Sequence, residues 1–494
     1  MIINTLVLVT GTLSISIPIG VFLALLITRT NLPGRRLLLF LMAILLVVPL
    51  YLQTGAWQAG FGLQGWYTLA SGYELIKDMR GAIWVHAVSA VAWVTMIVAA
   101  GLRTVPREME EEALLFGSAA AVLRKVTLPR ATGAIGIAAL WVAVATAGEM
   151  TVTDLFRVRT YAEELYLAHA ATADMDAAAL QLLSGMIVTA LLVAAGLLLC
   201  NRLMPREDAI SFRPLHDFTL GRWRWPLFAL AVAMLLVFLG IPLGNLIYRA
   251  GAEFSATADG VTTRQWQLSK FLDMVVVQSI RQFGQEFVCS LIVGAISASV
   301  VLVVATLLAW CGGAGRWQAA AVYLVVAVCL AVPGPLLGVA VIRLLGGLPS
   351  VYDSLAAPSL AISLSALPVA TMIMWHALRS IPSSMLDAAR QEGAGPGARL
   401  VLIALPARWP ALAVTWLVVM ILAVGDLSAS QLVQVPGQGT LANRVFDRLH
   451  SGAYDQVCGA FLALLGFFAG LTALVFSLAA IWQRQVSGAR SGEG

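Results

Sequence analysis

The chain has 494 residues, of which 60% are hydrophobic and only 12% are charged, and its formal net charge is +5. A soluble protein carries about a quarter charged residues, so this composition excludes an ordinary soluble globular protein. Apolar runs of about 20 residues, the length that crosses a bilayer as a helix, recur along the chain and predict a polytopic membrane protein.

Eleven membrane-spanning helices are predicted from the apolar runs. Glycines and prolines occur inside several of them, as they do in helices that pack against one another in lipid. The expected fold class is therefore all-α and polytopic, with about 11 transmembrane helices. In chain order, the predicted spans lie near residues 3–28, 37–56, 82–101, 132–148, 180–200, 226–248, 287–310, 318–342, 358–377, 411–425 and 458–482.

The distribution of Lys and Arg predicts how these spans are oriented. If the first loop, 29–36, faces the cytoplasm and the spans alternate from there, the cytoplasmic segments contain 20 of the 31 Lys and Arg residues. Loops rich in Lys and Arg tend to stay in the cytoplasm. The N-terminus is therefore expected outside, the C-terminus inside, and the long segment 249–285 outside.

Several function classes lack the residues that they need. The basic residues form no clustered face for nucleic acid, and the five cysteines are scattered without a Cys-x-x-Cys pair, so neither a metal site, a disulfide framework nor a cofactor is expected. The sequence contains neither a Gly-x-x-x-x-Gly-Lys-[Ser/Thr] loop for phosphate nor a Gly-x-Ser-x-Gly or His-Glu-x-x-His motif. The chain itself is therefore not expected to be an enzyme.

Two cytoplasmic segments resemble each other. Residues 102–117 read "LRTVPREMEEEALLFG", and residues 378–393 read "LRSIPSSMLDAARQEG". The resemblance continues into the spans on both sides, because "SAVAWVTMIVAAGLRTVP" aligns with "SALPVATMIMWHALRSIP" and "RKVTLPRATGAIGIAALWVAVATAGE" with "VLIALPARWPALAVTWLVVMILAVGD". Polar landmarks in one order and at one spacing predict two homologous halves. Since six spans separate the two segments, the halves have parallel topology.

The predicted domain division follows from this repeat. Residues 1–204 form the first transmembrane domain, residues 205–225 a polar cytoplasmic linker, and residues 226–494 the second domain, in which the aligned repeat begins at about 284. The span 226–248 has no counterpart in the first half. Either the first half dispenses with that helix, or the chain starts after it.

The repeated loop has a composition suited to transmitting motion. A carboxylate offers a charge-assisted bond to a basic partner, alanines permit close approach, glycine lets the chain turn at low steric cost, and Leu-Pro marks re-entry into the bilayer. The alternative is a solvated loop with ordinary helix caps. The residues concerned are Glu111, Glu112, Ala113, Gly117, Leu128 and Pro129 in the first copy, and Asp387, Ala388, Ala389, Gly393, Leu405 and Pro406 in the second.

This pattern resembles the signature of type I ABC importer permeases, in which Glu-Ala-Ala is followed by Gly and a hydrophobic-x-Leu-Pro ending. The second copy fits well, with Asp387 in place of Glu; in the first copy Glu112 replaces an alanine and the interval from Gly to Pro is one residue shorter. Two such domains in one chain, with "NLPGRR" after the first span, are most similar to the ferric-iron and thiamine branch.

The resemblance implies partners and a location. Two ABC ATPase subunits would dock on the cytoplasmic face and hydrolyse ATP, and a periplasmic or lipoprotein binding protein would deliver the solute. The protein would lie in the inner (plasma) membrane. The resemblance implies no nucleic-acid partner.

Each Leu-Pro is followed 20 residues later by an acid, Glu149 or Asp426. At 1.5 Å per residue this distance is about 30 Å of helix, so both acids are expected near the outer ends of equivalent spans. They are either solvated at the interface or face one another at the mouth of the translocation pathway, where they would favour a cation or hydrogen-bond a polar solute. His86 and His376 are not at equivalent positions and are interpreted as packing or helix-end residues.

The leading function is therefore the permease subunit of an ATP-driven importer, with ferric iron or thiamine as the hypothetical solute. The alternative is an ion-gradient-driven secondary carrier with parallel repeats that uses Glu149 and Asp426 as its ion site. In a carrier, the sequence similarity between the two halves should be greatest around polar residues in mid-membrane. In this chain the similarity is greatest in and around a cytoplasmic loop. A membrane assembly scaffold would leave the repeated loop without a role.

Overall fold

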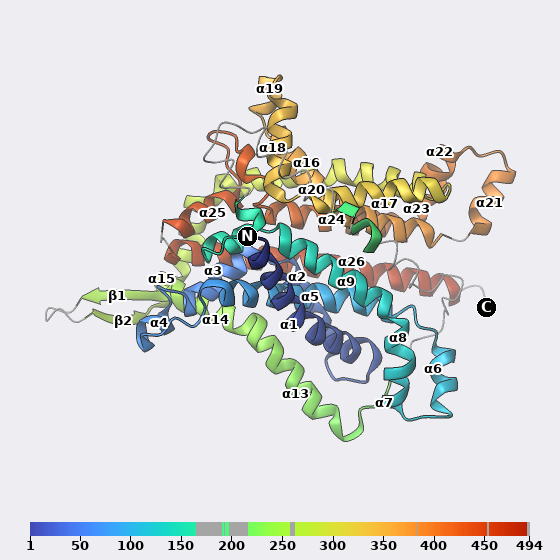
Figure 1. Cartoon of the computed structure of the whole chain (residues 1–494), viewed down its shortest axis with the longest axis horizontal. Helices are drawn as coiled ribbons and strands as arrows, with labels where there is room; N and C mark the ends of the chain where they lie inside the picture. Colours follow the sequence, from blue (N-terminus) through green and yellow to red (C-terminus); the bar gives the residue numbers. More distant parts are fainter. Residues whose placement is uncertain are drawn as a thin grey trace. The chain divides into compact units, whose positions relative to one another are not determined.

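A computed structural model describes residues 1–164, 190–191, 193–196, 216–256, 262–381, 383–451 and 454–491. The described residues fall into two compact units. The first draws on Met1–Ala179, Ala195–Phe287 and Leu441–Phe468, and the second on Leu180–Ala194, Val288–Thr440 and Ala469–Gly494. The structure is almost entirely helical (Figure 1), which confirms the predicted all-α class.

Three long helices form the centre of the first unit: α1 (Ile2–Arg29), α5 (Asp78–Leu102) and α9 (Thr132–Gly148). α1 contains no charged residue before its final arginine and is hydrophobic enough to cross a membrane. Small residues bring the helices close together, since a side chain at Gly20 would collide with Val94 of α5.

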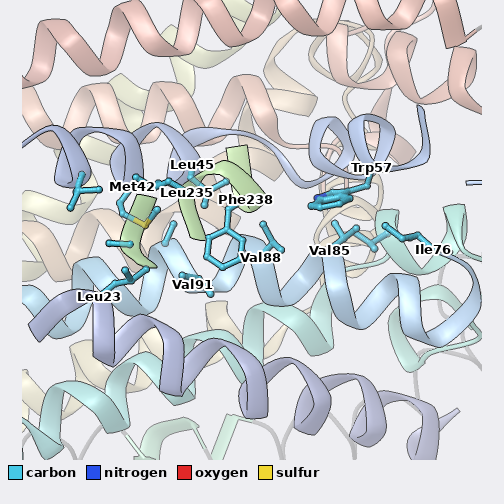
Figure 2. Packing of buried hydrophobic residues seen from close by; sticks show 14 of the residues in the cluster. Leu23, Met42, Leu45, Trp57, Ile76, Val85, Val88, Val91, Leu235 and Phe238 are labelled. Atoms are coloured by element: carbon cyan, nitrogen blue, oxygen red, sulfur yellow. The ribbon is translucent and has the colours of Figure 1, made fainter. Parts of the chain in front are cut away.

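The core of the first unit extends from α5 toward α2 (Arg35–Val47), α3 (Leu50–Phe61), α13 (Arg224–Leu235) and η4 (Leu236–Gly240). Figure 2 shows Leu23, Met42, Val88 and Phe238 filling this core. Trp57 of α3 packs edge to face against Trp84, with ring centroids 5.5 Å apart. α13 therefore packs with helices far earlier in the sequence.

Two predicted spans are sharply bent instead of straight. The chain turns by 98° between α2 and the following helices α3 and α4 (Trp66–Ser71), and by 103° between α17 (Arg316–Ala331) and α18 (Gly334–Leu345). Each break has a Val-Pro pair, Val48-Pro49 or Val332-Pro333. Proline removes a backbone donor and forces the preceding residue into an extended conformation, and both valines have ψ near 115–118°.

The same succession of elements follows α5 in the first unit and α20 (Ala356–Arg379) in the second. A short helix is followed by a helical turn, a π-helix, a one-turn helix, a kink and a 17-residue helix. The kinks measure 60° and 81°. The elements are α6 (Arg107–Leu114), α7 (Ala119–Val122), η1 (Leu123–Thr127), α8 (Leu128–Arg130) and α9, and α21 (Ser383–Gln391), α22 (Pro396–Arg399), η6 (Leu400–Ala404), α23 (Leu405–Ala407) and α24 (Trp409–Gly425).

The second unit is built around α20, which packs against α17, α18 and α24. Its core includes Leu337, Val341, Ala361 and Val433. The remaining elements of the chain are α10 (Thr151–Leu155), η3 (Gly221–Trp223), α14 (Ile241–Gly251), β1 (Ala252–Ala256), β2 (Thr262–Trp266), α15 (Leu268–Leu272), η5 (Asp273–Gln278), α16 (Ser279–Gly312), α19 (Pro349–Tyr352), η7 (Gln431–Val433), α25 (Leu441–His450) and α26 (Tyr454–Ser491).

The predicted external segment 249–285 contains structure that the sequence did not indicate. β1 and β2 form an antiparallel hairpin in the register Ala252↔Trp266 to Ala256↔Thr262. Helix then begins at Leu268 and continues to Gly312, so it starts well before the predicted span at 287.

Six helices in the described part of the chain are long and apolar enough to cross a membrane, and up to ten spans result if each of four bent pairs counts as one. These ten coincide with ten of the eleven predicted spans. The other predicted span, 180–200, lies largely outside the described residues.

Candidate functional site

The first repeated loop presents a short helix and an apolar tip. α6 begins after Pro106, and the chain beyond it exposes Leu115 and Phe116, which are 79% and 88% exposed. Glu112 is exposed as well. Glu111, one of the predicted coupling-loop residues, accepts a hydrogen bond of 2.6 Å from Nε of Arg107, one turn earlier.

A different acid of the same helix, Glu110, is fully buried. Its Oε2 lies 2.9 Å from Nη1 of Arg29, and its Oε1 accepts a hydrogen bond of 2.7 Å from the Thr127 hydroxyl. The motif comparison did not single out Glu110. The available signal was an arginine at the end of an apolar span and the first glutamate of the run Glu110–Glu112, neither of which is specific.

The second repeated loop is more exposed than the first. No side chain of α21 is buried, and Asp387 and Ala388 are exposed. Gly393 has a φ of +85°, a left-handed conformation that favours glycine. Its N–H donates to the carbonyl of Arg390, and the Ala394 N–H donates to the carbonyl of Ala389. This pair of bonds is the Schellman ending of a helix, so Gly393 ends α21.

The corresponding glycine of the first loop works differently. Gly117 lies outside the left-handed region. The next helix is instead started by Ser118, whose hydroxyl accepts the N–H of Ala121 at 3.4 Å. A serine N-cap satisfies a donor at the start of a helix. The first loop therefore depends on its glycine less than the second does.

Both Leu-Pro pairs lie at the same place in this succession. Leu128-Pro129 opens α8 directly after η1, and Leu405-Pro406 opens α23 directly after η6. Proline is tolerated in the first turn of a helix. The kink follows at Ala131 in the first case and at Arg408 in the second, so the long helices α9 and α24 start immediately beyond the pairs.

The two acids predicted near the outer helix ends, Glu149 and Asp426, follow α9 and α24, respectively. Glu149 follows α9, and its carboxylate accepts the N–H of Thr151 at 2.7 Å and that of Val152 at 2.9 Å. These bonds close the turn that begins α10. The carboxylate also lies 3.6 Å from Nε2 of the buried His86 of α5. His86 had been interpreted as a packing or helix-end residue, and this contact with an acid was not predicted.

Asp426 caps its own turn in a similar way. One oxygen, Oδ1, accepts the N–H groups of Ala429 and Ser430 at 3.1 and 3.2 Å, and Oδ2 lies 3.5 Å from the Ser365 hydroxyl of α20. Each outer acid therefore has a structural role at the end of a long helix, whatever it does for a solute. His376 lies in the last turn of α20.

A search of the described residues for three or more His, Cys, Asp or Glu side chains arranged to hold a metal ion finds no such group. The candidate residues lie in the two repeated loops and at the ends of α9 and α24.

This geometry defines the class of protein. It is an all-α polytopic membrane protein in which loops made of a short helix, a glycine and a Leu-Pro pair connect long apolar helices. Residues 302–488 match the family of binding-protein-dependent transport system inner membrane components. This part of the chain, which contains the whole second loop, belongs to that family, and the match confirms the predicted type I ABC importer permease. A comparison with curated proteins finds no match to the chain.

The match supports a multi-pass membrane component of an ABC transporter. It also implies that the permease works together with ATPase and binding-protein components.

Proposed function

We propose that the chain forms the translocation pathway of an ATP-driven importer, in which separate ATPase subunits dock on the two cytoplasmic loops. The observation that carries this proposal is the second loop, where α21, the left-handed Gly393 and Leu405-Pro406 lie inside the region that matches the family. The first loop supports it, because the same succession of elements recurs there.

The exposed side chains of the loops suit docking onto another protein. Leu115 and Phe116 form an apolar tip that water alone would not favour, and exposed apolar groups of this kind are typical of interaction surfaces. The second loop presents Gln391 and Glu392 at the corresponding place, and Asp387 is available for a charge-assisted bond. The two loops would therefore use different chemistry to bind their partners.

The chain is further proposed to consist of two homologous halves, 1–204 and 226–494, joined by the linker 205–225. In support, α6 to α9 and α21 to α24 have the same element order and end in helices of equal length. The N-terminus is proposed to lie outside the inner membrane and the C-terminus in the cytoplasm, as the Lys and Arg distribution predicts.

The proposed solute is a cation, with ferric iron first and thiamine second. The support is limited to Glu149 and Asp426, two carboxylates at the outer ends of α9 and α24, and to the resemblance of the fused chain to that branch. Carboxylate oxygens suit a hard cation, and both acids would line the pathway close to where solute leaves the binding protein.

Transport energetics test the proposal. Membrane vesicles from the native host, with and without a deletion of this gene, are loaded with ATP and supplied with the host's periplasmic extract and labelled ferric iron or thiamine. Uptake is expected to need the gene and ATP, and to persist when ionophores collapse the ion gradients. Uptake that stops with the ionophores and ignores ATP would instead favour the secondary carrier.

A further inference from the structure

A buried ion pair ties the first cytoplasmic helix to the end of the first span. Arg29 is the last residue of α1 and Glu110 lies in the middle of α6, and both side chains are 0% exposed. Besides its bond to Glu110, Arg29 donates through Nη2 to the backbone carbonyls of Leu102 and Val105, at 2.5 and 3.2 Å. A single guanidinium therefore holds the end of α5, the connection to α6, and α6 itself.

The carboxylate of Glu110 is held from a second side. The Thr127 hydroxyl of η1 donates to Oε1 at 2.7 Å, and Thr127 is fully buried. Removing one partner from a buried pair leaves a charge without compensation and is strongly destabilising. We call Arg29, Glu110 and Thr127 the clamp.

The chain that leads into the second half also attaches beside the clamp. The N–H of Phe218 donates to the carbonyl of Arg29 at 2.8 Å, and the N–H of Asn31 donates to the carbonyl of Phe218. Asp217 forms an exposed ion pair of 2.9 Å with Arg35. The segment just before α13 therefore lies against the same end of α1 that holds α6.

The second loop has no such clamp among the described residues. Leu386 stands where the repeat places Glu110, and α21 buries no side chain. The loop is held where it returns to the membrane, by the Arg408 guanidinium, which donates to the carbonyl of Ser380. The two loops are thus attached to their spans in different ways.

We infer that Arg29 is a positioning residue for energy coupling: through Glu110 it makes α6 move together with α1, as well as with α5 and α9, to which α6 is joined by the chain. A push on α6 then reaches three spans at once, because a packed, ion-paired contact transmits displacement as a rigid body. A push on α21 reaches only the helices joined to it directly. The inference rests on the proposed function, since it needs a partner that moves α6.

The test combines Glu110→Gln, which removes the charge while keeping the side chain's size, with a reporter cysteine. Val105 is 2% exposed beneath the clamp, so Val105→Cys, in a chain whose five native cysteines are replaced, should react slowly with a maleimide in inverted vesicles. Glu110→Gln is expected to raise this labelling rate roughly tenfold or more, because it opens a buried pair. The matched control is Arg444→Gln, which breaks a partly exposed pair with Glu286 and should leave the rate unchanged.

Coupling is measured in right-side-out vesicles, loaded with ATP and supplied with the host's periplasmic extract, as uptake of the labelled solute per ATP hydrolysed. Glu110→Gln is expected to lower this ratio by about tenfold, a typical coupling factor between linked sites, while ATP hydrolysis continues. A purely structural role would lower uptake and hydrolysis together with the amount of inserted protein. If Glu110→Gln fails to insert, Thr127→Val, which keeps the ion pair, should shift both readouts less far in the same direction.

Unchanged labelling of Val105→Cys, or an unchanged ratio of uptake to hydrolysis, would overturn the inference. The outcome is separable from failure of the proposed function. If the wild type shows no ATP-dependent uptake of either solute, the proposed function fails, whereas the labelling of Val105→Cys still decides whether the clamp holds α6 in place.

Discussion

The Nε2 of His86 lies 3.6 Å from the Oε2 of Glu149, so a histidine of α5 and the acid that ends α9 share one buried position. His86 is 3% exposed, and the Glu149 side chain is 12% exposed. The contact joins the first part of α5 to the end of α9. Glu149 therefore has two structural roles: it contacts His86 of α5, and it accepts the two backbone N–H groups that begin α10.

Replacing Glu149 by Gln should destabilise the protein more than replacing Asp426 by Asn. Glu149 uses one oxygen for each of two backbone N–H groups, and the amide nitrogen of Gln cannot accept a hydrogen bond. One buried donor is then left without a partner, which costs about 1–3 kcal/mol. Asp426 uses Oδ1 for both of its N–H groups, so Asn retains the acceptor. Thermal unfolding in detergent measures both changes, and equal losses would contradict the capping account.

Substitutions of Gly393 should uncouple transport more strongly than substitutions of Gly117. A left-handed conformation costs a residue other than glycine about 1–2 kcal/mol, and proline at 393 would also remove the N–H that bonds Arg390. We expect Gly393→Pro and Asp387→Lys to abolish ATP-coupled uptake in protein that still inserts, with Gly117→Ala and Glu111→Gln milder. The measurement is the stimulation of ATP hydrolysis by the binding protein. Stimulation equal to that of the wild type in both second-loop variants would count against docking at α21.

The proposed orientation places the hairpin outside and the second loop inside. In intact cells of the native host, freed of an outer membrane where one is present, an impermeant maleimide should label Gln265→Cys on β2 but not Glu392→Cys after α21. Both positions are exposed, so a difference in labelling reports the side of the membrane. Labelling of Glu392→Cys only after the membrane is permeabilised is the matched control. If Glu392→Cys reacts in sealed cells, both the orientation and the docking of ATPase subunits there are wrong.

The spans could be predicted from sequence because a helix that crosses lipid needs a continuous apolar run of the right length, and such a run is visible locally in the sequence. The sharp bends at Pro49 and Pro333 could not be given an angle, although each Val-Pro pair is visible. Proline breaks the hydrogen-bond ladder locally, but the direction that the chain then takes depends on the helices packed around it.

The candidate site was predictable only in part, for the same reason. The repeated pattern correctly located Gly393 as a turn, since only local backbone geometry is required there. It ranked Glu111 above Glu110, because the burial of Glu110 depends on Arg29, 81 residues earlier in the chain. Contacts between residues so far apart leave no periodicity in a single sequence.

The ion pair between His450 and Asp154 should make stability depend on pH. Nε2 of His450 lies 3.1 Å from Oδ2 of Asp154, and the hydrogen bond that His450 donates to Asp154 raises the pKa of His450, which ends α25 outside the spans. A pKa raised in the folded state adds stability below the unfolded value of about 6.5, and this contribution is lost as pH rises through the folded pKa. The effect is small because the His450 side chain is 45% exposed.

The unfolding temperatures of wild type and His450→Gln should therefore differ at pH 5.5–6 and converge at about pH 8–9, above the histidine's titration range. Arg444→Gln serves as control, because an arginine stays charged throughout that range. If the difference between the two unfolding temperatures grew toward high pH, the ion pair would not be the source of the stability, and the prediction would be wrong.

The last prediction concerns the charge that the two outer acids bring to the pathway. If the solute is a cation, the double change Glu149→Gln with Asp426→Asn should lower uptake of labelled ferric iron or thiamine while ATP hydrolysis still responds to the binding protein. The reason is that two carboxylates offer negative potential and hard oxygen ligands that a neutral amide does not.

Because Glu149→Gln also weakens a helix end, a control must share that defect and keep the negative charge. The change Thr151→Pro removes one of the same N–H donors and leaves both acids in place. Uptake per inserted molecule should be lower in the double mutant than in this control. Equal uptake in the two would assign both acids to helix capping alone and would leave the cationic solute without support from any residue.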